Sequence, residues 1–168
     1  MSRRFLGRAC LFALLAAALF SGPLAAGEAI AVIIARDAPT LSLDLSTLRE
    51  VYLKLFQMDD QGRALIPVNL PPEHPLRRGL SEVLFQKSAQ QLQVYWNQRY
   101  FQGISPPYVL QSEEAVVQFV AKTPGAIGYV AACHVDSTVR ALLLIPAPAD
   151  AHAAIQRLCP SSSGRGAQ

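Results

Sequence analysis

The stretch TPGAIGYV, from Thr123 to Val130, lies between an amphipathic segment and an apolar segment, and its residues indicate where a helix ends and a strand begins. Pro124 and Gly125 are typical of a helix end, because proline cannot continue a helix and glycine readily adopts the left-handed conformation that follows one. A turn alone would need only this pair. Gly128 lies inside the next apolar run, where glycine indicates that another segment approaches the strand backbone closely. The stretch therefore predicts a helix that stops at residues 122–125 and a strand that follows it.

The first 29 residues have the three-part pattern of a secretory signal peptide. A basic start with three arginines precedes an apolar run over residues 9–20, and small residues follow that run. The apolar run is shorter than the roughly 18 residues that a membrane-spanning helix needs. We therefore predict export to the periplasm, with cleavage after Ala26 of a signal peptide over residues 1–26, and no membrane span after cleavage. Cleavage after Gly27 or Ala29, twin-arginine export and an uncleaved anchor are the alternatives.

The charge of the predicted mature chain argues against nucleic acid as a partner. The whole chain has 15 basic and 12 acidic side chains and a net charge of +3. Loss of the three N-terminal arginines leaves 12 basic and 12 acidic side chains, so the net charge becomes zero. A polyanion-binding surface would need a clustered basic face, and the remaining lysines and arginines are scattered along the chain. We therefore expect no nucleic-acid binding.

The mature chain reads as one α/β domain with a mainly parallel or mixed sheet, because apolar strand-like runs are separated by helical ones. Asp44 is placed to cap one helix, and Pro67 suggests a sheet edge or a strand end because proline cannot donate to a ladder. The domain is predicted over residues 27–146. A weak helix and then a disordered tail are predicted over residues 147–168. The expected strands are residues 29–35, 64–70, 126–131 and 140–147, and the expected helices begin near residues 45, 75, 88 and 112.

Four segments in order resemble the small, single-lobe relatives of the periplasmic phosphate-binding protein of phosphate ABC transporters. The segments are AVIIARDAPTLSLDLSTLREVYLKLF, GRALIPVNLP, WNQRYFQGISPP and SEEAVVQFVAKTPGAIGYV, and they cover about residues 30–130. The end of the last segment, PGAIGY, matches the family pattern almost letter for letter. The resemblance implies a single lobe of the type II periplasmic-binding-protein fold, with a mixed sheet flanked by helices. It also implies that Gly128 and Tyr129 lie where the strand heads towards a hinge between two lobes.

The chain departs from this family in the loop that holds the anion. The family has a Ser-Gly-Ser-Gly-Thr-Arg loop after the second strand, whereas residues 72–77 here read PEHPLR. This stretch has no glycine and no hydroxyl, and its two prolines lack amide hydrogens, so only Arg77 carries over. Adjacent arginines at a helix start can also be solvated residues with no ligand. The residues expected at a weak anion site are His74, Arg77, Arg78, Asn69 and Tyr129.

The cysteines and histidines do not predict catalysis. Cys133 and Cys159 could pair in an oxidising compartment or remain as two thiols. Cys133 and His134 are expected on a strand, where adjacent side chains face opposite sides and do not share a proton easily. The histidines and cysteines show no metal-ligand spacing. We therefore expect no enzyme activity, no cofactor and no metal.

Two functions remain open at this stage. The first is an exported, non-enzymatic binding protein that resembles the substrate-binding component of a phosphate ABC transporter, holds a small phosphate-like anion weakly, and works with a membrane permease. The second is a periplasmic interaction or sensing protein that uses the lobe as a docking surface for a membrane sensor or an envelope partner. Aromatic residues around Tyr95 and Trp96 are mainly expected to fill the core, although a partner-facing patch is the alternative.

Overall fold

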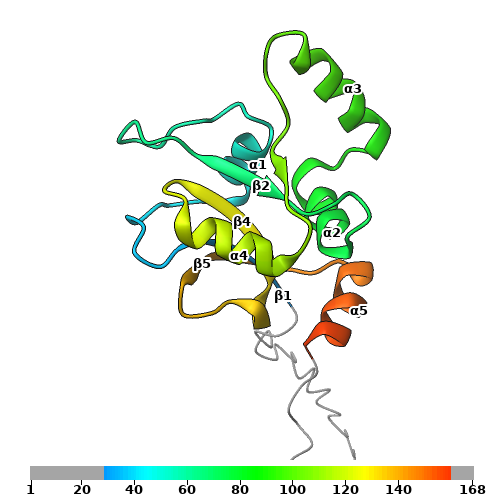
Figure 1. Ribbon diagram of the computed structural model, residues 1–168. Coiled ribbons are helices and arrows are strands. Elements are labelled where there is room, and N and C mark those ends of the chain that lie inside the picture. Colours follow the sequence, from blue (N-terminus) through cyan, green and yellow to red (C-terminus); the bar gives the residue numbers. More distant parts are fainter. Residues whose placement is uncertain (1–28, 160–168) are drawn as a thin grey trace, which may run out of the picture.

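The computed structural model describes residues 29–159 (Figure 1). The predicted signal peptide and residues 160–168 lie outside this range. The strands are β1 (Ala29–Ala35), β2 (Ile66–Asn69), β3 (Tyr108–Val109), β4 (Ala126–Ala131) and β5 (Val139–Pro146). The helices are α1 (Leu45–Tyr52), α2 (Pro75–Phe85), α3 (Ala89–Tyr100), α4 (Glu113–Lys122) and α5 (Ala149–Leu158), and a 3₁₀ turn, η2, spans Ala132–His134.

The strands form one mixed sheet in the order β3-β2-β4-β1-β5. β1 is antiparallel to both of its neighbours, β4 and β5, whereas β2 is parallel to β4 and to β3. Six of the seven residues of β1 are buried, which is expected of a strand with partners on both sides and helices on both faces. The predicted α/β fold with a mixed sheet is confirmed.

Helices cover both faces of the sheet (Figure 1). Gly128 of β4 faces α4, because a β-carbon on it would meet Val116 and Val120 of that helix. Tyr129 is the next residue, so it faces the other side of the sheet, and there its ring centroid lies 6.0 Å from that of Tyr52 in α1. α2 packs beside α1 on this second side, and α5 packs against α2.

The two glycines of the TPGAIGYV stretch have separate steric roles. Gly125 has φ +79°, and a β-carbon there would lie 2.0 Å from the carbonyl oxygen of Ala64. Gly128 has an ordinary φ, but its β-carbon would lie 2.5 Å from Cγ1 of Val116. The first glycine lets the chain turn back beside the segment before β2, and the second lets α4 lie close on β4. Both features agree with the sequence prediction.

Of the two alternatives for Pro67, the sheet edge is wrong, because β2 lies between β3 and β4. Pro67 instead lies one residue from the start of β2. The proline is tolerated there because β3 pairs only with Val68 and Asn69, so Pro67 has no ladder partner on that side. Residues 132–134 are also not part of a strand, because β4 ends at Ala131 and the chain enters η2.

The chain beyond residue 146 packs on the body of the protein as far as the structure describes it. Ala151 and Ile155 of α5 are fully buried. Gly79 of α2 makes this packing possible, since a β-carbon on it would lie 2.7 Å from the Cβ atom of Ala151. The Sγ atoms of Cys159, just after α5, and Cys133 in η2 form a disulfide. α5 is therefore packed on the body of the protein, whereas the sequence predicts a weak helix within a tail.

α3 lies at one end of the body (Figure 1). None of its residues with a described side chain is fully buried. It begins with the predicted capping box, in which the hydroxyl of Ser88 accepts from the Gln91 amide and the Gln91 side chain accepts from the Ser88 amide. Over residues 29–159, no helix has both the length and the apolar character needed to cross a membrane.

Candidate anion-binding site

The predicted site residues lie where β2 ends and α2 begins. In open α/β sheets ligands bind beyond the carboxyl ends of strands and at the N-termini of the helices that follow. Here β2 ends at Asn69, and the loop that follows leads directly into α2 at Pro75. The prolines around His74 therefore lie at a carboxyl edge of the sheet, as the resemblance requires.

Asn69 and Tyr129 hold the end of β2 in place. The Tyr129 hydroxyl donates to Oδ1 of Asn69 over 3.3 Å and accepts from the backbone N–H of Leu70 over 3.2 Å. Both side chains are buried, and burial raises the pKa of Tyr129 to about 12. The two residues thus direct their polar atoms at each other and at the loop, so they can position a site without facing solvent.

His74 is the N-cap of α2. Its Nδ1 atom accepts from the backbone N–H of Leu76 over 3.3 Å, which requires an unprotonated ring nitrogen. Burial lowers the pKa of His74, although the carboxylate of Glu113 opposes this effect, so the neutral ring that the cap needs is favoured. Pro75 has no N–H, and the Arg78 amide donates to the His74 carbonyl. Among the described residues, only the Arg77 amide of this first turn has no partner.

Arg77 and Arg78 both line a groove, but they face different neighbours. The charge of Arg77 acts on the buried hydroxyls of Tyr52 and Tyr129, where it opposes the rise of the tyrosine pKa values that burial causes. Arg78 is exposed, and its Nη1 donates to the carbonyl of Glu73 at the start of the helix. Among the described residues, the Arg77 guanidinium makes no hydrogen bond or ion pair, so it is available to an anion.

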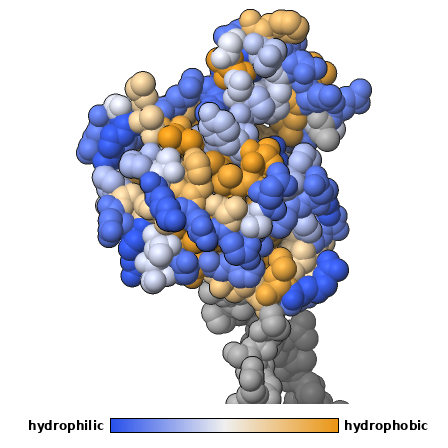
Figure 2. All heavy atoms as spheres, in the orientation of Figure 1, coloured by the Kyte–Doolittle hydropathy of each residue, from blue (hydrophilic) through white to orange (hydrophobic). Residues whose placement is uncertain are grey.

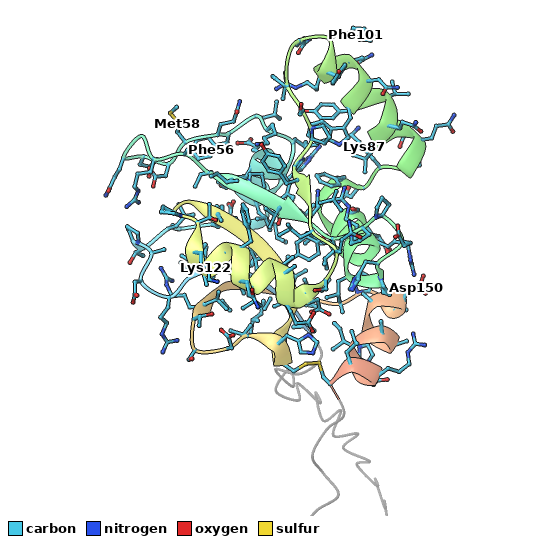
Figure 3. All side chains as sticks on the ribbon, viewed as in Figure 1. Phe56, Met58, Lys87, Phe101, Lys122 and Asp150 are labelled. Carbon is cyan, nitrogen blue, oxygen red and sulfur yellow. A yellow bond between two sulfur atoms is a disulfide. The ribbon has the colours of Figure 1, made fainter. Side chains whose placement is uncertain are left out.

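The groove lies between α2 and α3 and has a volume of about 600 Å³. It contains three cations against one acid, Glu82, and the third cation, Lys87, lies in the link between the two helices (Figure 3). The indole ring of Trp96 lines the groove on the α3 side and packs edge-on against the ring of Tyr95, with 4.9 Å between the ring centroids. The lining residues are Pro72, Arg77, Arg78, Ser81, Glu82, Gln86, Lys87, Leu92, Gln93 and Trp96.

α3 is held against the end of α1, and this contact fixes the far wall of the groove. The Tyr95 hydroxyl donates to the Leu53 carbonyl over 2.7 Å, and Nη2 of Arg99 donates to the Lys54 carbonyl over 3.3 Å. Sequence reasoning missed Lys87 and Trp96 as groove residues, because only the packing of α3 brings them opposite Arg77. The capping box at Ser88 located the start of α3 but not its orientation.

A second hollow lies at the opposite edge of the sheet and suits an anion less well. It has a volume of about 390 Å³ and is lined mainly by apolar side chains and by backbone of the TPGAIGYV stretch. Arg63 in its wall is already paired with Asp59, with 2.5 Å between Nε and Oδ2. Asp37 and Lys122 are its other charged residues. Of these two hollows in the described part of the chain, the α2–α3 groove is the one that combines a clear cationic excess with the start of a helix.

Comparison with solved structures finds the same fold in two phosphate-binding proteins. The chain is similar to a phosphate ABC transporter substrate-binding protein with bound phosphate from Clostridium perfringens, with a TM-score of 0.55 and 19% identity over 68% of this chain and 44% of that one. It is also similar to an ABC-type phosphate transport receptor from Vibrio cholerae, with a TM-score of 0.55 and 15% identity over 68% of this chain and 45% of that one. The protein has the fold of a single phosphate-binding-protein lobe. This lobe spans less than half the length of the two proteins it matches. No protein-family model matches the sequence, and no curated protein matches it.

Proposed function

We propose that this lobe is an exported, non-enzymatic binding protein that holds a small anion such as phosphate weakly in the α2–α3 groove. The observation that carries the proposal is the position of Arg77. Its guanidinium and its backbone N–H are both without a partner among the described residues, and they lie at the positive end of an 11-residue helix. Arg78 and Lys87 add positive charge to the same groove. The similar structures are transport binding proteins, one of them with bound phosphate, which supports this choice of ligand.

The same geometry explains why the binding would be weak. A tight anion site is built from several converging N–H groups in a place that excludes water. Before Arg77, Pro71, Pro72 and Pro75 have no N–H group to donate. The backbone N–H of Leu76 already donates to the ring of His74. The described residues form a single lobe, so they supply no second wall that would enclose the anion. We therefore expect millimolar affinity, about 4 kcal/mol of binding free energy.

The only tryptophan of the chain, Trp96, lines this groove and reports on its contents. Phosphate added at constant ionic strength should change the Trp96 emission with saturation. The Arg77→Gln variant should lose most of this affinity, by tenfold or more, because a charge-assisted hydrogen bond is removed. Arg49→Gln is the matched control, since Arg49 is exposed on α1 outside the groove. An equal response in wild type and Arg77→Gln, or no response in either, would contradict the proposal.

A second candidate function rests on the exposed aromatic residues near the end of α3. Phe101 is 89% exposed, and Tyr100 and Tyr108 are each more than two-thirds exposed. On the face shown in Figure 2, apolar side chains also gather between α3 and α4. Val109 of the edge strand β3 is exposed as well. Such residues suit a docking surface for a membrane sensor or an envelope partner. This candidate predicts that no anion alters Trp96 emission and that Phe101→Asp abolishes cross-linking to one membrane partner in intact cells.

A further inference from the structure

Cys133, His134 and Cys159 come together where the end of β4 meets the end of α5, and none of the three lines the α2–α3 groove. Cys133 and His134 lie in η2, at the end of β4, and Cys159 follows α5. One potential ligand atom from each of these residues lies within 4.8 Å of the other two. In the oxidised protein the two sulfur atoms are bonded to each other. Sequence reasoning raised the pairing of the two cysteines but expected no metal site, because the cysteines are 26 positions apart and show no metal-ligand spacing.

A buried carboxylate orients the histidine of this set. Oε2 of Glu113 lies 3.0 Å from Nδ1 of His134, and the same oxygen accepts from the Ala131 amide over 2.6 Å. Glu113 is 5% exposed, so its position is fixed by the body of the protein. A neutral His134 therefore donates its Nδ1–H to Glu113 and leaves a lone pair on Nε2. Histidines that bind metal ions are typically held in this way by a carboxylate on the other ring nitrogen.

We propose that reduction of the Cys133–Cys159 disulfide converts this corner into a binding site for a thiophilic cation such as Zn²⁺. A dithiol reductant breaks the S–S bond, becomes a disulfide itself, and supplies the two electrons and two protons that give two thiols. Binding of the ion then displaces both thiol protons and joins two thiolates and one imidazole nitrogen. Two cysteines and one histidine, with water in the fourth position, are an established zinc ligand set. Cys133 is exposed, which gives the ion and the water access.

The distances are compatible with a site formed by side-chain rotation. Zinc bonds of about 2.3 Å to sulfur and about 2.0 Å to nitrogen place tetrahedral ligand atoms roughly 3.5–4 Å apart. The three ligand atoms now lie within 4.8 Å of one another, and the Cα atoms of the two cysteines are 6.0 Å apart. After the S–S bond is broken, rotation of the cysteine side chains has to move the two sulfur atoms apart to the tetrahedral spacing. Because the same sulfurs form either the disulfide or the metal bonds, the two states exclude each other. The redox state of Cys133 and Cys159 therefore gates metal binding.

The full-length protein carrying Cys10→Ser tests this inference, because the two remaining cysteines are then those of the proposed site. Oxidised and phosphine-reduced samples are each titrated with Zn²⁺ against a chromophoric chelator, and with Co²⁺ to record a thiolate-to-cobalt charge-transfer band. The reduced protein should bind one ion with that band, and the oxidised protein should bind none. His134→Ala and Cys133→Ser should remove the binding, and Glu113→Gln should weaken it by about 10–100-fold.

Circular dichroism of each sample separates loss of the site from loss of the fold. His134 lies half-buried in a surface turn, so His134→Ala is expected to remain folded even if Glu113→Gln does not. Equal Zn²⁺ affinity in the oxidised and reduced protein overturns the proposal, as does binding that survives His134→Ala. Reduced protein that is unfolded both with and without Zn²⁺ also overturns it and leaves the disulfide as a structural cross-link.

Discussion

Replacement of Gly128 by alanine tests the packing of α4 on the sheet. The added β-carbon would lie 2.5 Å from Cγ1 of Val116 and 2.9 Å from Cγ2 of Val120, against about 3.5–4.0 Å for an ordinary carbon contact. Both valines are fully buried, and valine has one strongly preferred rotamer in a helix, so neither side chain can turn away cheaply. The helix must move or the valines must strain. We expect a loss of about 1–3 kcal/mol in unfolding free energy.

Urea unfolding at 25 °C measures this loss, with a lower midpoint and an unchanged slope. The matched variant is Gly128→Ala combined with Val116→Ala, which removes the nearest obstructing atom. The double variant should be more stable than the sum of the single losses predicts, by about 1 kcal/mol. Gly62→Ala is a useful contrast, because Gly62 has φ +75° but open space around its β-carbon, so it shows the conformational cost alone. Wild-type stability in Gly128→Ala, or strict additivity in the double variant, would refute the proposed packing.

Three further changes test other parts of the structure. Burial raises the pKa of Tyr129 to about 12 and that of Tyr52 well above 10. The stability gained by keeping both hydroxyls neutral is therefore complete below pH 10 and is lost as the pH rises through the folded-state pKa values. An ultraviolet tyrosinate titration should show two tyrosines that ionise only as the protein unfolds. Reduction of the Cys133–Cys159 disulfide in metal-free buffer should lower stability by about 3.5 kcal/mol by the loop-entropy estimate for a separation of 26 residues, measured as a shift in the urea midpoint. Ser88→Ala removes one half of the capping box and should cost about 1 kcal/mol, visible as faster amide exchange at the start of α3.

Local signals explain why most elements could be predicted. Asp44 accepts from the Thr47 amide at the start of α1, and Ser88 and Gln91 form the expected capping box. Such signals depend on side chains within four residues of one another, so one sequence is enough to find them. The continuous apolar run of β1 and the Pro-Gly end of α4 are equally local. The fold itself followed from the resemblance, which covers most of the described chain.

Features that depend on distant residues were missed. β3 has only two residues and follows two prolines, so its pairing with β2 left no pattern in the sequence. α5 was placed in a tail because its partner surface, around Gly79, lies about 70 residues earlier in the chain. The groove cation Lys87 and the Cys133–His134–Cys159 set likewise depend on how separate elements pack. A single sequence carries no signal for these contacts.

Thermal unfolding of the purified protein in increasing phosphate tests most directly whether one lobe alone holds an anion at the start of α2. We predict a single cooperative transition whose midpoint rises with phosphate, equivalent to about 1.4 kcal/mol at ten times the dissociation constant. At the same ionic strength, Arg77→Gln should unfold at a midpoint that phosphate does not change. A midpoint independent of phosphate in the wild type, or an equal rise in Arg77→Gln, would contradict this account.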